Sequence, residues 1–159
     1  MPRQVRPMGP ADAPVVRTLQ GLLTYADPDL VDAAIADAGV FVGRVAVDPG
    51  GTHRIGLDGH RGQADLVVGY AVAFPASGTA DRATISELAV APGHRRRGHG
   101  RALVEAVAEA TDASALGVAT PAENETALRF YRELGFERVA RLEGFYRDGT
   151  DALRLVRRE

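Results

Sequence analysis

The stretch Ile85-Ser86-Glu87-Leu88-Ala89-Val90-Ala91-Pro92-Gly93-His94-Arg95-Arg96-Arg97-Gly98-His99-Gly100-Arg101-Ala102-Leu103-Val104 decides how this chain folds. It begins as an apolar strand, continues as a loop rich in arginine and glycine, and ends in the first turn of a helix. Glycine lets the backbone approach a ligand closely, and the N–H groups at a helix start point at an anion. The stretch therefore predicts a pyrophosphate site, with a solvated basic loop as the alternative.

The spacing within this loop narrows the kind of phosphate site. Arg95, Gly98 and Gly100 fit the pattern Arg/Gln-x-x-Gly-x-Gly/Ala. A P-loop would continue with lysine and a hydroxyl residue, whereas Gly100 is followed by Arg101 and Ala102. The dinucleotide fingerprint would need a third glycine, which does not follow at the required spacing. Both of these nucleotide-binding motifs are thereby excluded.

A second segment, Ala122-Glu123-Asn124-Glu125-Thr126-Ala127-Leu128-Arg129-Phe130-Tyr131-Arg132-Glu133-Leu134-Gly135-Phe136, predicts an amphipathic helix. Asn124 is a good N-cap, and Leu128, Tyr131 and Leu134 recur at the spacing of one helical face. Gly135 is expected to end the helix. Asn124 and Tyr131 are seven residues apart and so share a face. Taken alone, Tyr131 would be read as core packing and Asn124 as a plain cap.

Together, in this order and separated by a short strand, the two segments resemble two hallmarks of the GCN5-related N-acetyltransferases (GNAT). These are the acyl-CoA loop and the motif Asn-x-x-Ala-x-x-Phe-Tyr-x-x-x-Gly-Phe. The resemblance implies an α/β GNAT fold, with a central mixed sheet of about seven strands and helices on both faces. It also implies an N-acetyltransferase that moves acetyl from acetyl-CoA, the co-substrate, directly to a primary amine. Its specific part spans residues 83–136.

The resemblance also assigns expected roles to individual residues. The loop from Arg95 to Arg101 would hold the phosphates, the strand edge of 87–90 would pair with the pantetheine arm, and the N–H of Leu88 or Ala89 would stabilise the oxyanion. Tyr131 would be the general acid that protonates the leaving thiolate. The implied acetyl-CoA-binding residues are Leu88, Ala89, Val90, Arg95, Arg96, Arg97, Gly98, His99, Gly100, Arg101, Asn124 and Tyr131.

Glu87 is the candidate catalytic base, acting directly or through water, because an acceptor ammonium must lose a proton before it can attack. Strand alternation counted from Ile85 places Glu87 on one face with Ile85 and Ala89. A carboxylate among apolar residues is costly unless it is solvated or paired. The alternative is therefore a solvent-facing or salt-bridged glutamate without a catalytic role.

The sequence says least about which amine accepts the acetyl group. The tail from Leu142 to Leu153 resembles enzymes that acetylate protein N-termini, including the ribosomal-protein alanine type, and Phe145 and Tyr146 could line a peptide groove. Those bacterial enzymes tend to carry a catalytic glutamate where this chain has Ala119. The acceptor site is expected between 25–30 and the final strand pair. A small-molecule amine acceptor and a non-catalytic acyl-CoA sensor stay open.

The composition bounds the remaining function classes. The 159 residues are expected to form a single domain over 1–159, and a net charge of -2 gives no drive toward nucleic acid or anionic membrane. The chain has no cysteine and no lysine, so neither can take part in catalysis. His53 and His60 are expected to be solvated loop residues, with no metal site. Residues 1–10 lack the apolar core of a signal peptide, so a cytoplasmic protein is expected. A homodimer is compatible with the resemblance.

Hydrophobic periodicity and turn residues predict the other elements. Helices are expected over 10–25, 29–38, 100–110 and 124–134. Strands are expected over 3–6, 40–47, 66–74, 83–90, 116–120, 136–142 and 152–156. The glycine-rich stretch 48–64 is expected to be a loop, and Asp148-Gly149 marks a turn.

Overall fold

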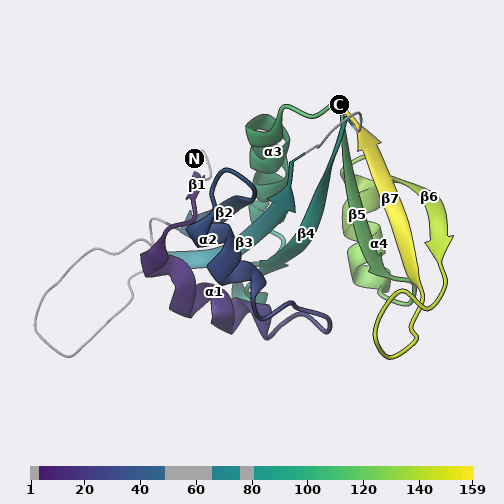
Figure 1. The fold of residues 1–159 in the computed structure, drawn as a ribbon, viewed down its shortest axis with the longest axis horizontal. Helices are drawn as coiled ribbons and strands as arrows, with labels where there is room; N and C mark the ends of the chain where they lie inside the picture. Colours follow the sequence, from purple (N-terminus) through teal and green to yellow (C-terminus); the bar gives the residue numbers. More distant parts are fainter. Residues whose placement is uncertain (1–3, 49–65, 76–80) are drawn as a thin grey trace, which may run out of the picture.

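The computed structural model describes residues 4–48, 66–75 and 81–159. Its elements, coloured along the chain in Figure 1, are β1 (Gln4–Pro7), the 3-10 turn η1 (Pro10–Asp12), α1 (Ala13–Gln20), α2 (Leu30–Ala36), β2 (Val42–Asp48), β3 (Leu66–Phe74), β4 (Arg82–Val90), η2 (Pro92–His94), α3 (His99–Thr111), β5 (Ala115–Pro121), α4 (Glu125–Glu133), β6 (Glu137–Leu142) and β7 (Ala152–Arg158). The predicted order of helices and strands is confirmed.

The strands form one seven-stranded sheet in the order β1-β2-β3-β4-β5-β7-β6. Neighbours pair antiparallel except β4 and β5, which run parallel and are joined by the crossover helix α3. The sheet is therefore mixed, as the sequence predicted.

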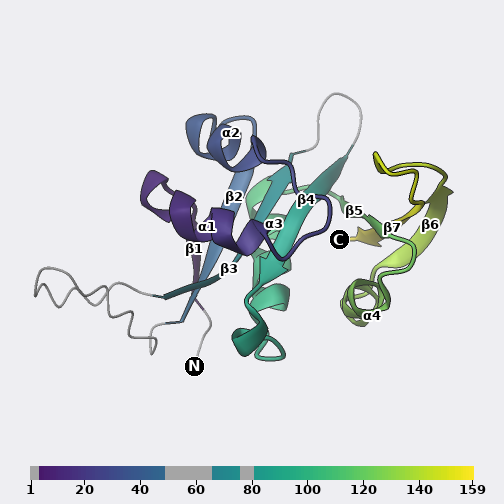
Figure 2. The same ribbon diagram turned by 90° about the horizontal axis from the view of Figure 1, so that it is seen from below.

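Helices cover both faces of the sheet, and each face has its own apolar cluster. α1 and α2 pack with Val45, Tyr70 and Val72 on one face. α3 and α4 pack with Ile85, Leu116 and Leu155 on the other. Figure 2 shows α1 and α2 together on one side of the strands, with α3 on the opposite side. The second face is the one that the two sequence motifs build.

A β-bulge in β4 corrects the expected arrangement around Glu87. The register runs from Val72↔Glu87 to Ala73↔Ile85, so Ser86 is an extra residue with no partner on β3. An extra residue shifts the alternation of side chains by one position. Ile85 therefore packs in the cluster beneath α3, whereas Ala89 packs beneath α1 and α2. Glu87 shares a face with Ala89 but not with Ile85, contrary to the expectation.

The same bulge marks the point where β4 and β5 separate. The parallel pairing covers only Arg82–Ile85 of β4 and Ala115–Val118 of β5. Figure 1 shows the two strands together at one end and splayed apart at the other. The sheet thus divides into an N-terminal arm, β1–β4, and a C-terminal arm, β5–β7, which meet at only one end.

Element boundaries differ from expectation mainly around α1. This helix ends at Gln20 rather than near Tyr25, and the following turns close through Leu22 N–H to Leu19 O and Leu23 N–H to Gln20 O bonds of 3.0 Å each. Gly21 favours that early end because glycine is a poor helix former.

The turn at Asp148-Gly149 is confirmed, with Gly149 at φ 84°. The predicted loop 48–64 lies outside the described residues beyond Asp48, the last residue of β2. None of the described helices has the length and apolarity to cross a bilayer.

Candidate functional site

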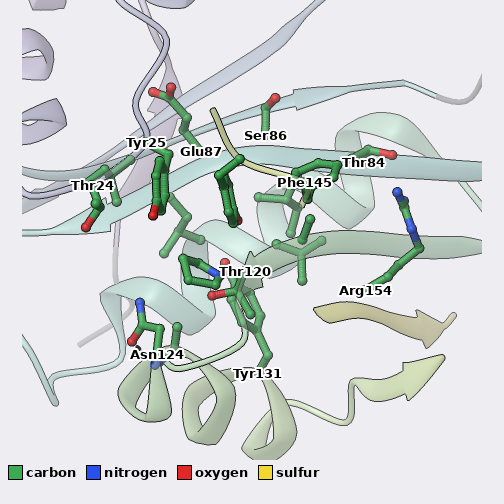
Figure 3. Close-up of a pocket in the computed structure, with 18 of the residues that line it drawn as sticks. Thr24, Tyr25, Thr84, Ser86, Glu87, Thr120, Asn124, Tyr131, Phe145 and Arg154 are labelled. Atoms are coloured by element: carbon green, nitrogen blue, oxygen red, sulfur yellow. Dashed lines mark hydrogen bonds between the residues drawn. The ribbon is translucent and has the colours of Figure 1, made fainter. Parts of the chain in front are cut away.

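A cavity of about 570 Å³ occupies the space between the two arms of the sheet. Figure 3 shows it with Thr84, Ser86 and Glu87 on the β4 side and Asn124 and Tyr131 on the α4 side. Its lining is Leu22, Leu23, Thr24, Tyr25, Asp27, Thr84, Ile85, Ser86, Glu87, Leu88, Val118, Ala119, Thr120, Pro121, Asn124, Ala127, Tyr131, Phe145, Tyr146 and Arg154. The cavity therefore joins the Glu-Leu strand to the Asn…Tyr helix.

Glu87 is buried at the β4 wall of this cavity, with only 6% of its surface exposed. Its Oε1 accepts hydrogen bonds from Gln20 Nε2 and the Tyr70 hydroxyl, both at 2.8 Å. Its Oε2 accepts one from the Asp27 N–H at 2.7 Å. Neutral donors, not a salt bridge, thus compensate the buried carboxylate. Burial raises the pKa of Tyr70, and the nearby charge of Glu87 raises it further. The proton shared in this hydrogen bond therefore stays on the phenol.

The backbone of β4 beyond the bulge presents a free edge to the cavity. Ala91 N–H donates to Val68 O at 2.8 Å, so alternation turns the backbone groups of Ala89 toward β3 as well. Leu88 and Val90 turn theirs away from β3, toward the gap left by β5. Of the two alternative oxyanion donors, the N–H of Leu88 faces the gap and that of Ala89 faces β3.

Helix α4 brings Asn124 and Tyr131 to the same cavity, as their spacing predicted. Asn124 caps the helix by accepting the Ala127 N–H at 3.1 Å, which leaves its amide nitrogen as a donor. Tyr131 is 6% exposed and packs edge-on against Phe130 and Phe136. Burial raises its pKa, so the hydroxyl keeps its proton at neutral pH.

The arginine loop lies at the start of α3, with the side chains of Arg95, Arg96, Arg97 and Arg101 exposed. Gly98, the residue before the helix, has φ 81° and needs glycine for this conformation. Arg95 Nε donates to the free carbonyl of Val90 at 3.0 Å, which ties the loop to the β4 edge. His99 and Gly100 begin the helix and are buried.

Gly100 has a packing role that the sequence did not suggest. A Cβ at this position would lie 2.8 Å from the ring of Phe130. The absence of a side chain therefore allows α3 and α4 to approach each other. Only Gly98 has a glycine requirement that comes from the conformation of the loop itself.

An aromatic bridge closes the far end of the cavity. Tyr25, in the loop after α1, stacks on Tyr146, in the loop between β6 and β7, with ring centroids 3.9 Å apart and an interplanar angle of 12°. The Tyr25 hydroxyl donates to Asp148 Oδ2 at 2.7 Å. This bond raises the pKa of Tyr25 and lowers that of Asp148. The two arms are thereby linked above the cavity, between the segments expected to frame the acceptor.

A family model described as an acetyltransferase (GNAT) domain matches residues 60–138, which include the arginine loop and the Asn…Tyr helix. The chain belongs to the GNAT acetyltransferase family. The resemblance drawn from the two motifs is confirmed, and the splayed sheet with a cavity between its arms is the GNAT fold in this chain.

Two N-alpha-acetyltransferase 30 proteins are among the GNAT relatives. That of Schizosaccharomyces pombe is 37% identical over 82 residues, which cover 50% of this chain and 55% of the relative. That of Xenopus laevis is 40% identical over 77 residues, which cover 46% of this chain and 28% of the relative. The matches thus span about half or less of either relative.

Solved GNAT structures match the whole described fold. NAA60 of Arabidopsis thaliana in complex with a bisubstrate analogue gives a TM-score of 0.77 at 22% identity, covering 99% of each chain. Ard1 from Thermoplasma volcanium gives 0.76 at 25% identity, covering 99% of this chain and 98% of that one. At this level of sequence identity, the structural likeness supports the fold and does not bear on the substrate.

The sequence did not predict several of the residues that line or support the cavity. Gln20 and Tyr70 reach Glu87 from α1 and β3, and Tyr25 reaches Asp148 across 123 positions, so no local pattern connects them. Arg154 was also missed, although its place between Leu153 and Leu155 in an alternating strand gives it the face opposite the core. His53 and His60 lie outside the described residues. Within the ranges that are described, no group of three or more metal-binding side chains comes together.

Proposed function

We propose that this GNAT protein transfers acetyl from acetyl-CoA to the α-amine at the N-terminus of a peptide or protein. The observation that carries the proposal is the single cavity that joins a free β4 edge and the Asn…Tyr helix to an acceptor end closed by Tyr25 and Tyr146. The N-alpha-acetyltransferase relatives support this acceptor class. A neighbouring structure, NAA60 of Arabidopsis thaliana in complex with acetyl-CoA, supports the acetyl donor.

The residues around the gap fit acetyl-CoA, which supplies an activated thioester. The N–H groups of Leu88 and Val90 offer hydrogen bonds that an extended amide chain needs, and the Asn124 amide adds a donor. The start of α3 offers N–H groups and positive charge from Arg95, Arg96 and Arg97 to the phosphates. The Leu88 N–H faces the gap in the cavity that Tyr131 also lines, where a fixed donor would stabilise a developing oxyanion.

Glu87 and Tyr131, which lie on opposite sides of β4, would each carry out one of the two proton transfers. Glu87, on the face toward α1, takes a proton from the acceptor ammonium, directly or through water. Tyr131, on the face toward α4, holds a proton that it donates to the leaving sulfur. Ala119 offers no carboxylate, so Glu87 and Asp27 are the acids of the described cavity lining. The amine would therefore approach the thioester on the face of β4 that Glu87 shares with α1.

The test combines acetyl-CoA binding with turnover in one preparation. Calorimetry should show acetyl-CoA binding to the wild type and to Tyr131→Phe with similar affinity. Thiol release should then occur with peptides that have a free N-terminus and not with the same peptides blocked at the N-terminus. In Tyr131→Phe the turnover number should fall by about 10²-fold or more, the usual contribution of a positioned acid.

Other outcomes would replace the proposal. Thiol release with small amines such as polyamines or aminoglycosides, and with no peptide, would make the protein a small-molecule acetyltransferase. Acetyl-CoA binding without thiol release from any acceptor would favour the sensor function. A lack of acetyl-CoA binding would refute the proposed role of the arginine loop.

A further inference from the structure

Arg154 is the only arginine in the described lining of the cavity, and its position is unusual for an arginine. It is partly buried, and its side chain makes no hydrogen bond or ion pair with another residue of the described ranges. Two other arginines show how such a charge is matched, since Arg6 pairs with Asp12 and the partly buried Arg157 pairs with Glu105. A guanidinium has five N–H donors, and leaving them unmatched in a partly buried place is unfavourable. The site therefore has donors available for a ligand.

The register of β7 directs this side chain to the face of the sheet away from α4, the face on which Glu87 also lies. Leu153 and Leu155 pack in the cluster beneath α4, so Arg154 between them faces the opposite side of the sheet. Figure 3 shows its side chain extending away from α4. Its direct neighbours on the adjacent strands are Ala119 and Ala140. Two short neighbours leave room beside the guanidinium for a ligand.

The charged groups of the cavity are separated between its two walls. Asp27 and Glu87 come from the α1 side and β4, where Glu87 accepts hydrogen bonds from Gln20, Tyr70 and Asp27. Arg154 comes from β7 on the other arm. An acceptor whose ammonium lies beside Glu87 would thus meet a positive charge on the opposite wall. That arrangement suits a molecule carrying both an amine and an anionic group.

We infer that Arg154 is a specificity residue that binds a carboxylate of the acceptor, so that the preferred substrate is a peptide with an acidic side chain within its first three residues. The inference rests on the proposed function, because it names the class of N-terminus accepted by the same site. The planar guanidinium suits a carboxylate, which it can bind through two parallel hydrogen bonds. The hydroxyls of Thr84 and Ser86, on β4, line the same cavity and offer further donors.

The test compares peptides that differ only by Glu, Gln or Lys at the second or third residue. The wild type should show a kcat/KM for the best Glu peptide that is roughly fivefold to tenfold above its Gln counterpart, as expected for one partly exposed charge-assisted bond. Arg154→Met should remove this preference, and Arg154→Glu should reverse it in favour of Lys. Arg158→Glu is the matched control, since it lies on the same face of β7 but outside the cavity lining. Thermal unfolding of each variant checks that the fold is retained.

Each outcome separates this inference from the proposed function. Peptide turnover with equal losses for Glu, Gln and Lys peptides in Arg154→Met would overturn the carboxylate subsite and leave the function standing. A reversal produced equally by Arg158→Glu would also overturn it, because a general field would then explain the preference. Turnover of free glutamate but of no peptide, abolished in Arg154→Glu, would support the subsite and overturn the peptide acceptor. A lack of turnover with every peptide and with free glutamate would overturn both.

Discussion

At the scale of single residues, the buried network of Glu87, Tyr70 and Gln20 is the least expected part of the molecule. The sequence offered a choice between a catalytic glutamate and a solvent-facing or salt-bridged one. The structure shows neither solvent exposure nor a counter-ion, and it anchors the loop after α1 to β4 through the Asp27 N–H. Glu87 thus holds the loop after α1 against β4 at the cavity wall, whatever its part in proton transfer.

This network predicts a specific stability defect at high pH. Tyr70 has its pKa raised by burial and by Glu87, so the folded state holds the phenol proton where the unfolded chain has lost it. Its contribution to stability is therefore fully present below about pH 10, the ordinary tyrosine value, and is lost as the pH rises above it. Tyr70→Phe should be less stable by about 1.5–3 kcal/mol at pH 7, because a hydrogen bond to a charged group is lost.

Urea unfolding of both proteins between pH 7 and 11 measures this effect. The stability gap between the wild type and Tyr70→Phe should narrow above pH 10, since only the wild type has this proton to lose. Other buried tyrosines, such as Tyr131, titrate in both proteins and cancel in the difference. A gap that stays constant up to pH 11 would contradict the raised pKa of Tyr70.

At the scale of elements, the sequence predicted what depends on local order and missed what depends on partners. Strand and helix identities follow from periodicity and from caps such as Asn124 and Gly135, which act within a few residues. The bulge at Ser86 has no such local signal, because it is defined only by pairing with β3. That one residue moved Ile85 to the opposite face from Glu87 and freed the β4 edge at Leu88.

The contact between α3 and α4 predicts the effect of a side chain at Gly100. Gly100→Ala should lower the free energy of unfolding by about 1 kcal/mol, because the clash with the Phe130 ring outweighs the better helix propensity of alanine. In a Phe130→Leu background the same substitution should be stabilising. Gly93→Ala is the control, since nothing lies within 4 Å of a Cβ there. Destabilisation of similar size in both backgrounds would argue against the helix contact as the reason for this glycine.

At the scale of the whole molecule, the two arms of the sheet are joined at one end by four β4–β5 residue pairs and across the cavity by the bridge of Tyr25, Tyr146 and Asp148. The sequence placed the acceptor site between these loops only through the family resemblance. The stacking itself joins residues 121 positions apart, and no periodicity could reveal it. We expect the bridge to limit how wide an acceptor the cavity admits, because it joins the two arms across the cavity.

Opening this bridge should change acceptor selection without changing acetyl-CoA binding. Tyr25→Ala removes both the stack and the hydrogen bond, so the KM for a peptide acceptor should rise by about fivefold or more while acetyl-CoA affinity stays within about twofold. Tyr25→Phe keeps the stack and loses only the bond to Asp148, so its effect should be the smaller of the two. Steady-state kinetics with a short peptide and with a bulkier amine would separate the effects: a bridge that limits access predicts that Tyr25→Ala gains activity on the bulkier amine. Equal loss of activity on both acceptors would instead mean that Tyr25 contributes only binding contacts. Removing a size limit would not lower the activity on an amine that the wild-type cavity excludes by size.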